Sequence, residues 1–188
     1  MKKLFYFLPF LLLVVGCDDD DDPVIENEEE VITDGVLQLT PANGGAAIRL
    51  VFSDPDGEGG NDAVITGGTL AASTTYNGRL ILTNNQEDGA TTGNISDEVR
   101  EEDEDHQVFY LVAGLPGTTV AYDDAETVDD DGNPLGLLTT LTTGTAGSGM
   151  LTVVLRHEPT KGAGVGISDV DSAGGETDIE VEFPLTVQ

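Results

Sequence analysis

The chain of 188 residues is poor in several residue types, and each shortage narrows its possible function. It has a single cysteine, Cys17, so no disulfide bond can form within the chain. It has no tryptophan and 5% aromatic residues, which disfavours a stacking platform for carbohydrates. Seven Lys and Arg residues stand against 36 Asp and Glu residues, and the net charge of −29 would repel the phosphates of nucleic acid.

The sequence also lacks the motifs of common catalytic sites. It contains no Gly-x-Ser-x-Gly elbow for a nucleophilic serine and no phosphate-binding glycine loop that ends in Lys-Ser or Lys-Thr. Acidic residues are so numerous that no pair can be singled out as a glycosidase dyad. We therefore expect a protein that is not an enzyme.

The first residues have the order of a lipoprotein signal peptide. Two lysines precede residues 4–15, an apolar run that is too short to cross a bilayer. Gly16 and Cys17 follow, and a small residue before a cysteine is what the lipoprotein signal peptidase requires. We expect residues 1–16 to be removed and Cys17 to anchor the protein to a membrane through acyl chains, palmitate among them. An ordinary secretory signal followed by a chance cysteine is the alternative.

Acidic residues follow Cys17 directly, beginning with five aspartates at residues 18–22. Because like charges extend a chain, residues 17–34 are predicted to form a solvated tether. Residues 35–188 then form one domain, which is long enough to bury a core. Without the two N-terminal lysines, five basic residues remain against 36 acidic ones, a formal charge of −31. This charge suits a cationic partner, a metal ion or simple solubility.

Apolar and polar residues alternate in short segments bounded by Gly, Asn, Asp or Pro, which is typical of β-strands. The segments with this pattern are 37–39, 48–52, 76–82, 120–122, 137–143, 150–157 and 177–185. Residues 108–113 are apolar on both faces, as in a central strand. In the last segment the alternation places Asp178 on the exposed face. The pattern predicts an all-β fold, a single Greek-key, Ig-like β-sandwich of about eight or nine strands, with a closed barrel as the alternative.

One segment, residues 94–105, lacks this alternation and is predicted to form a short helix. Asn94 or Ser96 would cap its N-terminus, and the acidic residues of its first turn suit the helix dipole. Its acidic C-terminal end opposes the dipole, so we expect that end to fray.

Four segments resemble the recurring blocks of a family of small Bacteroidota lipoproteins. They are EEDEDHQVFY (101–110), DDDGNPLG (129–136), LRHEP (155–159) and GGETD (174–178). Similar proteins are often labelled "type 1 periplasmic binding fold superfamily". That label implies a two-lobed α/β protein, whereas this chain shows no βαβ alternation. The resemblance implies no catalytic residues. It does imply that the protein acts together with a TonB-dependent receptor or another envelope protein.

The two histidines, His106 and His157, both lie among carboxylates. Glu102 is four residues before His106, so a helix continuing to His106 would place both on one face. Glu158 directly follows His157. Imidazole and carboxylate groups are suitable ligands for Zn²⁺ or another transition metal, so these four residues are a candidate site if the two segments meet. The alternative is that each histidine ends a strand and bonds to a neighbouring carboxylate.

Two acidic loops with a glycine turn are candidates for Ca²⁺, which prefers alternating oxygen ligands around a sharp turn. Their proposed ligands are Asp54, Asp56 and Glu58 in one loop, and Asp129, Asp131 and Asn133 in the other. Neither loop has the downstream Glu of an EF-hand. Ordinary Asp-Gly or Gly-Asn turns between strands are the alternative.

These features predict a non-enzymatic binding module anchored to the outer membrane. It would capture a divalent metal or another cationic ligand for a TonB-dependent receptor. A cysteine followed at once by acidic residues resembles the surface-export signal of Bacteroidota lipoproteins, which favours the cell surface over the periplasmic face. A structural or adhesive surface module without a small ligand is the alternative function.

Overall fold

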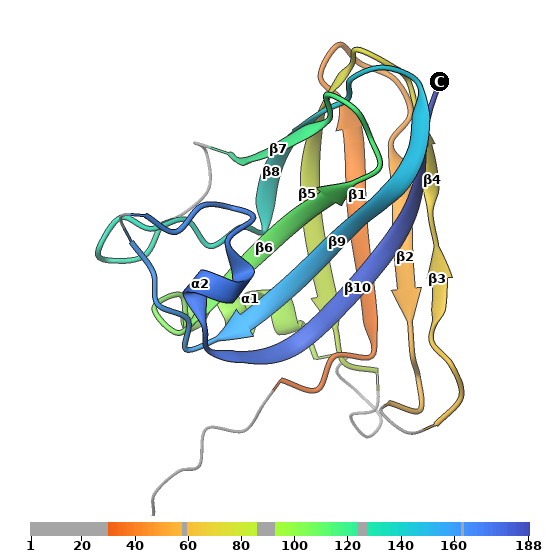
Figure 1. The fold of residues 1–188 in the computed structure, drawn as a ribbon. Coiled ribbons are helices and arrows are strands. Elements are labelled where there is room, and N and C mark those ends of the chain that lie inside the picture. The colour runs from red at the N-terminus through yellow and green to blue at the C-terminus, as the bar shows by residue number, and fades with distance from the viewer. Residues whose placement is uncertain (1–29, 58–59, 86–92, 124–127, 163) are drawn as a thin grey trace, which may run out of the picture.

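The computed structural model of the protein describes residues 30–57, 60–85, 93–123, 128–162 and 164–188. They form two β-sheets that pack face to face (Figure 1). One sheet has the order β3-β2-β1-β5-β8-β7, with β1 (Asp34–Pro41), β2 (Ile48–Ser53), β3 (Val64–Thr66), β5 (Thr75–Thr83), β7 (Thr119–Tyr122) and β8 (Leu138–Thr142). The other has the order β4-β10-β9-β6, with β4 (Gly68–Leu70), β6 (His106–Ala113), β9 (Gly147–His157) and β10 (Glu176–Val187).

The β-sandwich predicted from the alternation of apolar residues is confirmed, and its sheets do not close into a barrel. The described residues contain ten strands, where the sequence predicted eight or nine. The additional strands are β3 and β4, which have three residues each and are too short to show a pattern. All neighbouring strands are antiparallel except β4 and β10, which run parallel.

The core lies between the sheets and consists of the inward-facing residues of each strand. Leu37 and Leu39 of β1 are buried, and so are Val181 and Phe183 of β10 in the opposite sheet. Fully burying a side chain of this kind contributes roughly 1.5–3 kcal/mol. The residues between them are half-buried on β1 and exposed on β10, so the period-2 pattern of the sequence matches the two faces of each strand.

Strand β6 lies at the edge of its sheet, although its apolar pattern predicted a central strand. Its outer face is covered by α2 (Val170–Ala173), because Phe109 and Val154 pack against that helix. The backbone N–H groups of Val108 and Tyr110 donate to loop carbonyls, those of Leu135 and Ile167, both at 2.8 Å. Loops therefore cover the open edge of β6, while α2 and the opposite sheet cover its two faces, which explains its apolar sequence.

The predicted helix is present as α1 (Ile95–Glu101) and is shorter than the predicted segment 94–105. Asn94 occupies the predicted N-cap position, but its side chain makes no cap hydrogen bond, and Ser96 lies within the helix. The hydroxyl of Ser96 instead accepts a 2.7 Å hydrogen bond from the N–H of Leu82, which ties α1 to β5. Within the part of the chain that the structure describes, no helix is long and apolar enough to cross a membrane.

Candidate metal centre

The two histidines, which lie 51 residues apart in sequence, face each other at one end of the second sheet. The antiparallel register of β6 and β9 places His106 opposite His157. Their rings are stacked, with centroids 4.8 Å apart and an angle of 14° between the ring planes. Both residues are buried, at 0% and 4% exposure. The two segments named in the sequence as halves of one site therefore do meet.

A third residue, Asp178, joins the histidines because β10 has a bulge there. Thr177 pairs with Arg156 and Ile179 with Leu155, so Asp178 is the extra residue of the bulged strand. Simple alternation placed Asp178 on the exposed face, which is wrong, because the bulge changes the direction of its side chain. That side chain has 0% exposure, and its Oδ2 lies 3.8 Å from Nε2 of His106. Its Oδ1 lies 4.0 Å from Nδ1 of His157.

The ring of His106 is held in one tautomer by the backbone. Its Nδ1 lies 3.2 Å from the carbonyl oxygen of Glu102, and because a carbonyl can only accept, Nδ1 carries the hydrogen. In the neutral ring Nε2 then bears the lone pair. Nε2 is buried and has no hydrogen-bond partner among the described residues. A backbone carbonyl behind one nitrogen, with the other nitrogen unprotonated, is the usual arrangement of a metal-binding histidine.

Burial favours the neutral ring. Desolvation lowers the pKa of His106 below its ordinary value of 6.5, and the neighbouring His157 lowers it further, against the raising effects of Glu102 and Asp105. A neutral imidazole is the form that binds a metal ion.

Two more carboxylates border the site on the side of the helix. Glu102 places Oε2 3.8 Å from Nδ1 of His106. The helix ends at Glu101, so a turn, and not the predicted continuous helix, brings Glu102 to His106. Glu30 belongs to the same group, since ligand atoms of Glu30, Glu102 and His106 all lie within 4.8 Å of one another. His106, His157 and Asp178 meet the same criterion.

Glu30 has a raised pKa because it is partly buried and lies among other carboxylates. Partial burial and the nearby Glu98, followed by Glu102 and Asp178, raise its pKa from 4.5 to about 7. A carboxylic acid with this pKa marks a place where negative charge is crowded. Sequence reasoning assigned Glu30 to the tether and gave it no role.

Glu158, the fourth predicted ligand, is exposed and has a left-handed backbone with φ of 49°. Its N–H donates a 2.6 Å hydrogen bond to the carbonyl of Asp105, so its backbone joins the two histidine-bearing strands. The side chain lines a cavity of about 210 Å³ beside His157. It is absent from the groups of converging ligand atoms among the described residues.

The first predicted calcium loop is a hydrogen-bonded turn. Asp54 Oδ1 accepts from the N–H of Gly57 at 3.1 Å, and Asp56 Oδ2 accepts from the N–H of Asn61 at 2.9 Å. Glu58 lies outside the described residues. In the part that is described, Asp54 and Asp56 belong to no group of three converging ligand atoms.

In the second predicted calcium loop, Asp129 forms an ion pair with the ammonium group of Lys161. Asp129 accepts from the N–H of Asn133 at 2.6 Å and from the Asn133 side chain at 3.0 Å. Its Oδ2 also lies 3.3 Å from Nζ of Lys161, and both side chains are almost fully buried. Burial raises the pKa of Asp129, but these hydrogen bonds and Lys161 outweigh it, and the net shift is downward. Asp131 is exposed.

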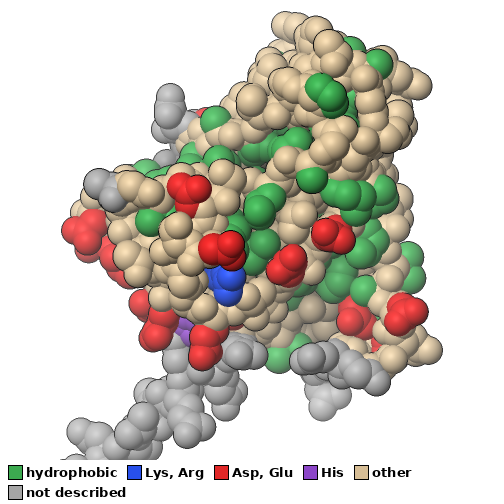
Figure 2. All heavy atoms as spheres, in the orientation of Figure 1, with side chains coloured by type: hydrophobic (Ala, Val, Ile, Leu, Met, Phe, Trp, Pro, Cys, Tyr) green, Lys and Arg blue, Asp and Glu red, His purple; other side chains and the backbone are tan. Residues whose placement is uncertain are grey.

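The carboxylates are visible over the surface of the face drawn in Figure 2, where a histidine lies between acidic side chains at the lower edge. Comparisons of the chain with protein-family models, with curated proteins and with solved structures find no match.

Proposed function

We propose that this protein is a non-enzymatic binding module of the bacterial envelope that captures a divalent transition-metal ion through His106, His157 and Asp178. The proposal depends mainly on the surroundings of Nε2 of His106. This nitrogen is buried, bears a lone pair and lies 3.8 Å from a carboxylate oxygen. A lone pair and a carboxylate repel each other unless a positive charge lies between them, so the pair favours a cation.

The distances suit metal ligation better than direct hydrogen bonding. At 3.8 and 4.0 Å, the nitrogen–oxygen separations exceed those of a hydrogen bond. Two bonds from Zn²⁺ to nitrogen or carboxylate oxygen, each about 2.0–2.1 Å long, can span such a separation. Two imidazoles and one carboxylate form a ligand set that favours Zn²⁺ or Cu²⁺ over Ca²⁺, which takes six or more oxygen ligands.

The surrounding charge supports capture of a cation. Glu30 and Glu102 border the site, and the whole chain carries a net charge of −29. A field of this sign raises the local concentration of cations and accelerates their association. Three protein ligands leave a coordination position for water or for an incoming ligand, as in exchangeable zinc sites.

The predicted lipid anchor determines the proposed cellular location of the site. We propose that Cys17 is lipidated and holds the domain at the outer membrane, at the cell surface, with residues 17–34 as a tether. The captured ion would pass to a TonB-dependent receptor or another envelope protein. The sequence order around Cys17 and the resemblance to Bacteroidota lipoproteins support this part of the proposal.

Calorimetric titration of the full chain in a mild non-ionic detergent tests the metal site. We expect Zn²⁺ and Cu²⁺ to bind with one ion per chain, and Ca²⁺ to bind far more weakly. The variant His106→Gln with His157→Gln should lose the Zn²⁺ and Cu²⁺ signal. The variant Glu158→Gln is the matched control, because it removes a charge next to His157 and leaves the three ligands in place. Equal binding by both variants would reject the site and favour a structural or adhesive module.

A further inference from the structure

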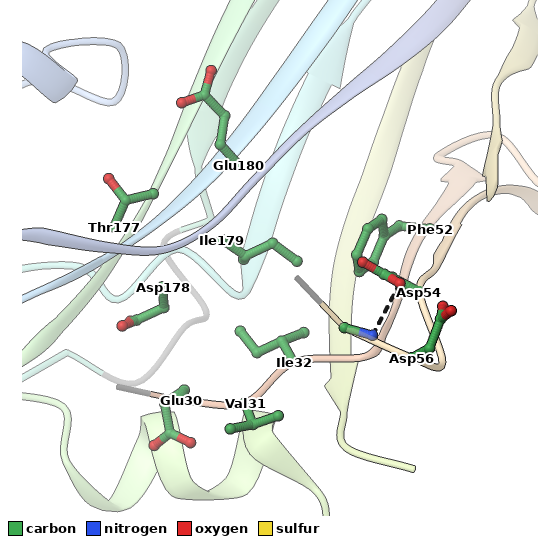
Figure 3. A pocket seen from close by; sticks show the side chains of 11 residues that line it. Glu30, Val31, Ile32, Phe52, Asp54, Asp56, Thr177, Asp178, Ile179 and Glu180 are labelled. Atoms are coloured by element: carbon green, nitrogen blue, oxygen red, sulfur yellow. Dashed lines mark hydrogen bonds between the residues drawn. The ribbon is translucent and has the colours of Figure 1, made fainter. Parts of the chain in front are cut away.

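A cavity of about 710 Å³ opens at one end of the sandwich, beside the candidate metal centre (Figure 3). It lies between the segment that leads into β1, the end of β2 with its following turn, and the start of β10. This volume is in the range of sites for small organic molecules. The cavity shares Glu30 and Asp178 with the groups of candidate ligands and extends well beyond them.

Negative charge lines the cavity on two sides. Glu30 and Asp178 lie together on one side in Figure 3, and Asp54 and Asp56 lie on the other. No lysine or arginine is among the described residues that line it. Asp54, Asp56 and Glu180 are in no group of three converging ligand atoms within the described chain. These carboxylates are too far apart to bind one small ion together. They are better suited to a ligand that carries two separated positive charges.

The region between the two acidic sides is apolar. The side chains of Ile32 and Ile179 lie at the centre of Figure 3, with Phe52 next to Asp54. Val31 also lines the cavity and is 53% exposed, an unusual exposure for a large aliphatic side chain in this protein. An inorganic ion would gain nothing from these side chains, whereas burying a CH₂ group contributes about 0.8 kcal/mol.

We propose that the cavity binds an organic dication of the alkyl diamine class, with one ammonium group at each end of a short apolar chain. The ammonium groups would lie near Glu30 on one side and near Asp54 and Asp56 on the other. The methylene chain would lie on Ile32, Ile179 and Val31. This site is separate from the metal ligands His106 and His157, and its occupant differs in chemical class from the metal ion.

Titration of the full chain with cadaverine, followed by NMR or calorimetry, tests this inference. Neutral pentanediol tests the need for charge, and ammonium chloride tests the need for the apolar chain. We expect saturable binding of cadaverine only, with one molecule per chain. If ammonium binds as tightly as cadaverine, or if cadaverine binding does not saturate, the proposal is overturned.

Variants separate the cavity from the general acidity of the surface. Asp54→Asn with Asp56→Asn should weaken cadaverine binding about tenfold, whereas Asp131→Asn with Asp171→Asn removes the same charge elsewhere and should change it less than about twofold. Ile179→Thr should weaken binding about fivefold without any change of charge. Equal effects of the two double variants would overturn the proposal.

The metal centre is tested separately in the same variants. Asp54→Asn with Asp56→Asn leaves all three proposed metal ligands intact, so Zn²⁺ binding should persist in it. Cadaverine binding should likewise persist in His106→Gln with His157→Gln. Loss of cadaverine binding in that histidine variant, with its fold intact by circular dichroism, would show that the cavity is not an independent site.

Discussion

Nε2 of His106 lies 3.8 Å from Oδ2 of Asp178, and both side chains are completely buried. His106 lies on β6 and Asp178 lies on β10, and these two strands flank β9 in the sheet. His157, on β9, stacks its ring on that of His106 and places Nδ1 4.0 Å from Oδ1 of Asp178. A cation bound to all three side chains would therefore link the three strands at one end of the sheet.

Asp178→Asn is expected to weaken Zn²⁺ binding about 100-fold, because the amide keeps the shape of the carboxylate and loses its charge. Competition with a chromogenic chelator measures the affinity. Glu182→Gln, on the exposed face of the same strand, is the control and should bind like the unmodified protein. An affinity of Asp178→Asn equal to that of this control would remove Asp178 from the ligand set.

Glu30→Gln is expected to stabilise the fold above pH 7. The pKa of Glu30 is raised from 4.5 to about 7, so the folded state holds the proton more tightly than the unfolded state. Its contribution to stability is therefore present below pH 4.5 and is lost as the pH rises through about 7. Because Glu30 is only partly buried, we expect a gain of about 1 kcal/mol at pH 8.

Urea denaturation of both proteins at pH 8 and pH 4, without metal, measures this effect. The difference in unfolding free energy should shrink at pH 4, where Glu30 is protonated in both states. His106 acts in the opposite sense. Its lowered pKa makes the fold less stable as the pH falls below 6.5. A difference that is constant between the two pH values would contradict the crowding of charge around Glu30.

Gly175→Ala is expected to destabilise the protein by more than about 3 kcal/mol and to impair metal binding. Gly175 precedes the bulge at Asp178, and a Cβ there would lie 2.3 Å from the carbonyl oxygen of His157. Gly174→Ala is the matched control, because its φ is also positive, at 65°, and nothing lies within 4 Å of its Cβ. It should show only the cost of an unfavourable backbone, about 1–3 kcal/mol. Thermal denaturation measures the loss of stability in both variants. Equal losses would contradict the predicted clash at Gly175.

Much of the fold follows from the alternation of apolar residues, and so does half of the site. The phase of β9 places His157 on the face of Leu155, and the phase of β6 places His106 with Val108, which agrees with the alternative in which each histidine lies at the end of a strand. Their adjacency depends on which strands pair, and no local pattern contains that information. A single sequence therefore identified the two residues without showing that they meet.

The two carboxylates beside the histidines, Asp178 and Glu30, could not be predicted for a different reason. Asp178 lies in a bulge, and one extra residue reverses the face to which period-2 reasoning assigns a side chain. Glu30 follows a run of acidic residues, and its local sequence is that of a tether. Its position against α1 depends on tertiary packing. A bulge of this kind has no signal in the sequence beyond the two glycines, Gly174 and Gly175, just before it.

The loops that bond to Val108 and Tyr110 also protect the protein from its own copies. An open edge strand with free N–H groups can add a strand from a neighbouring chain, which leads to aggregation. In β6 these outward N–H groups already donate to Leu135 and Ile167. Copies of this chain would therefore not join through this edge of the sheet, even where they lie close together.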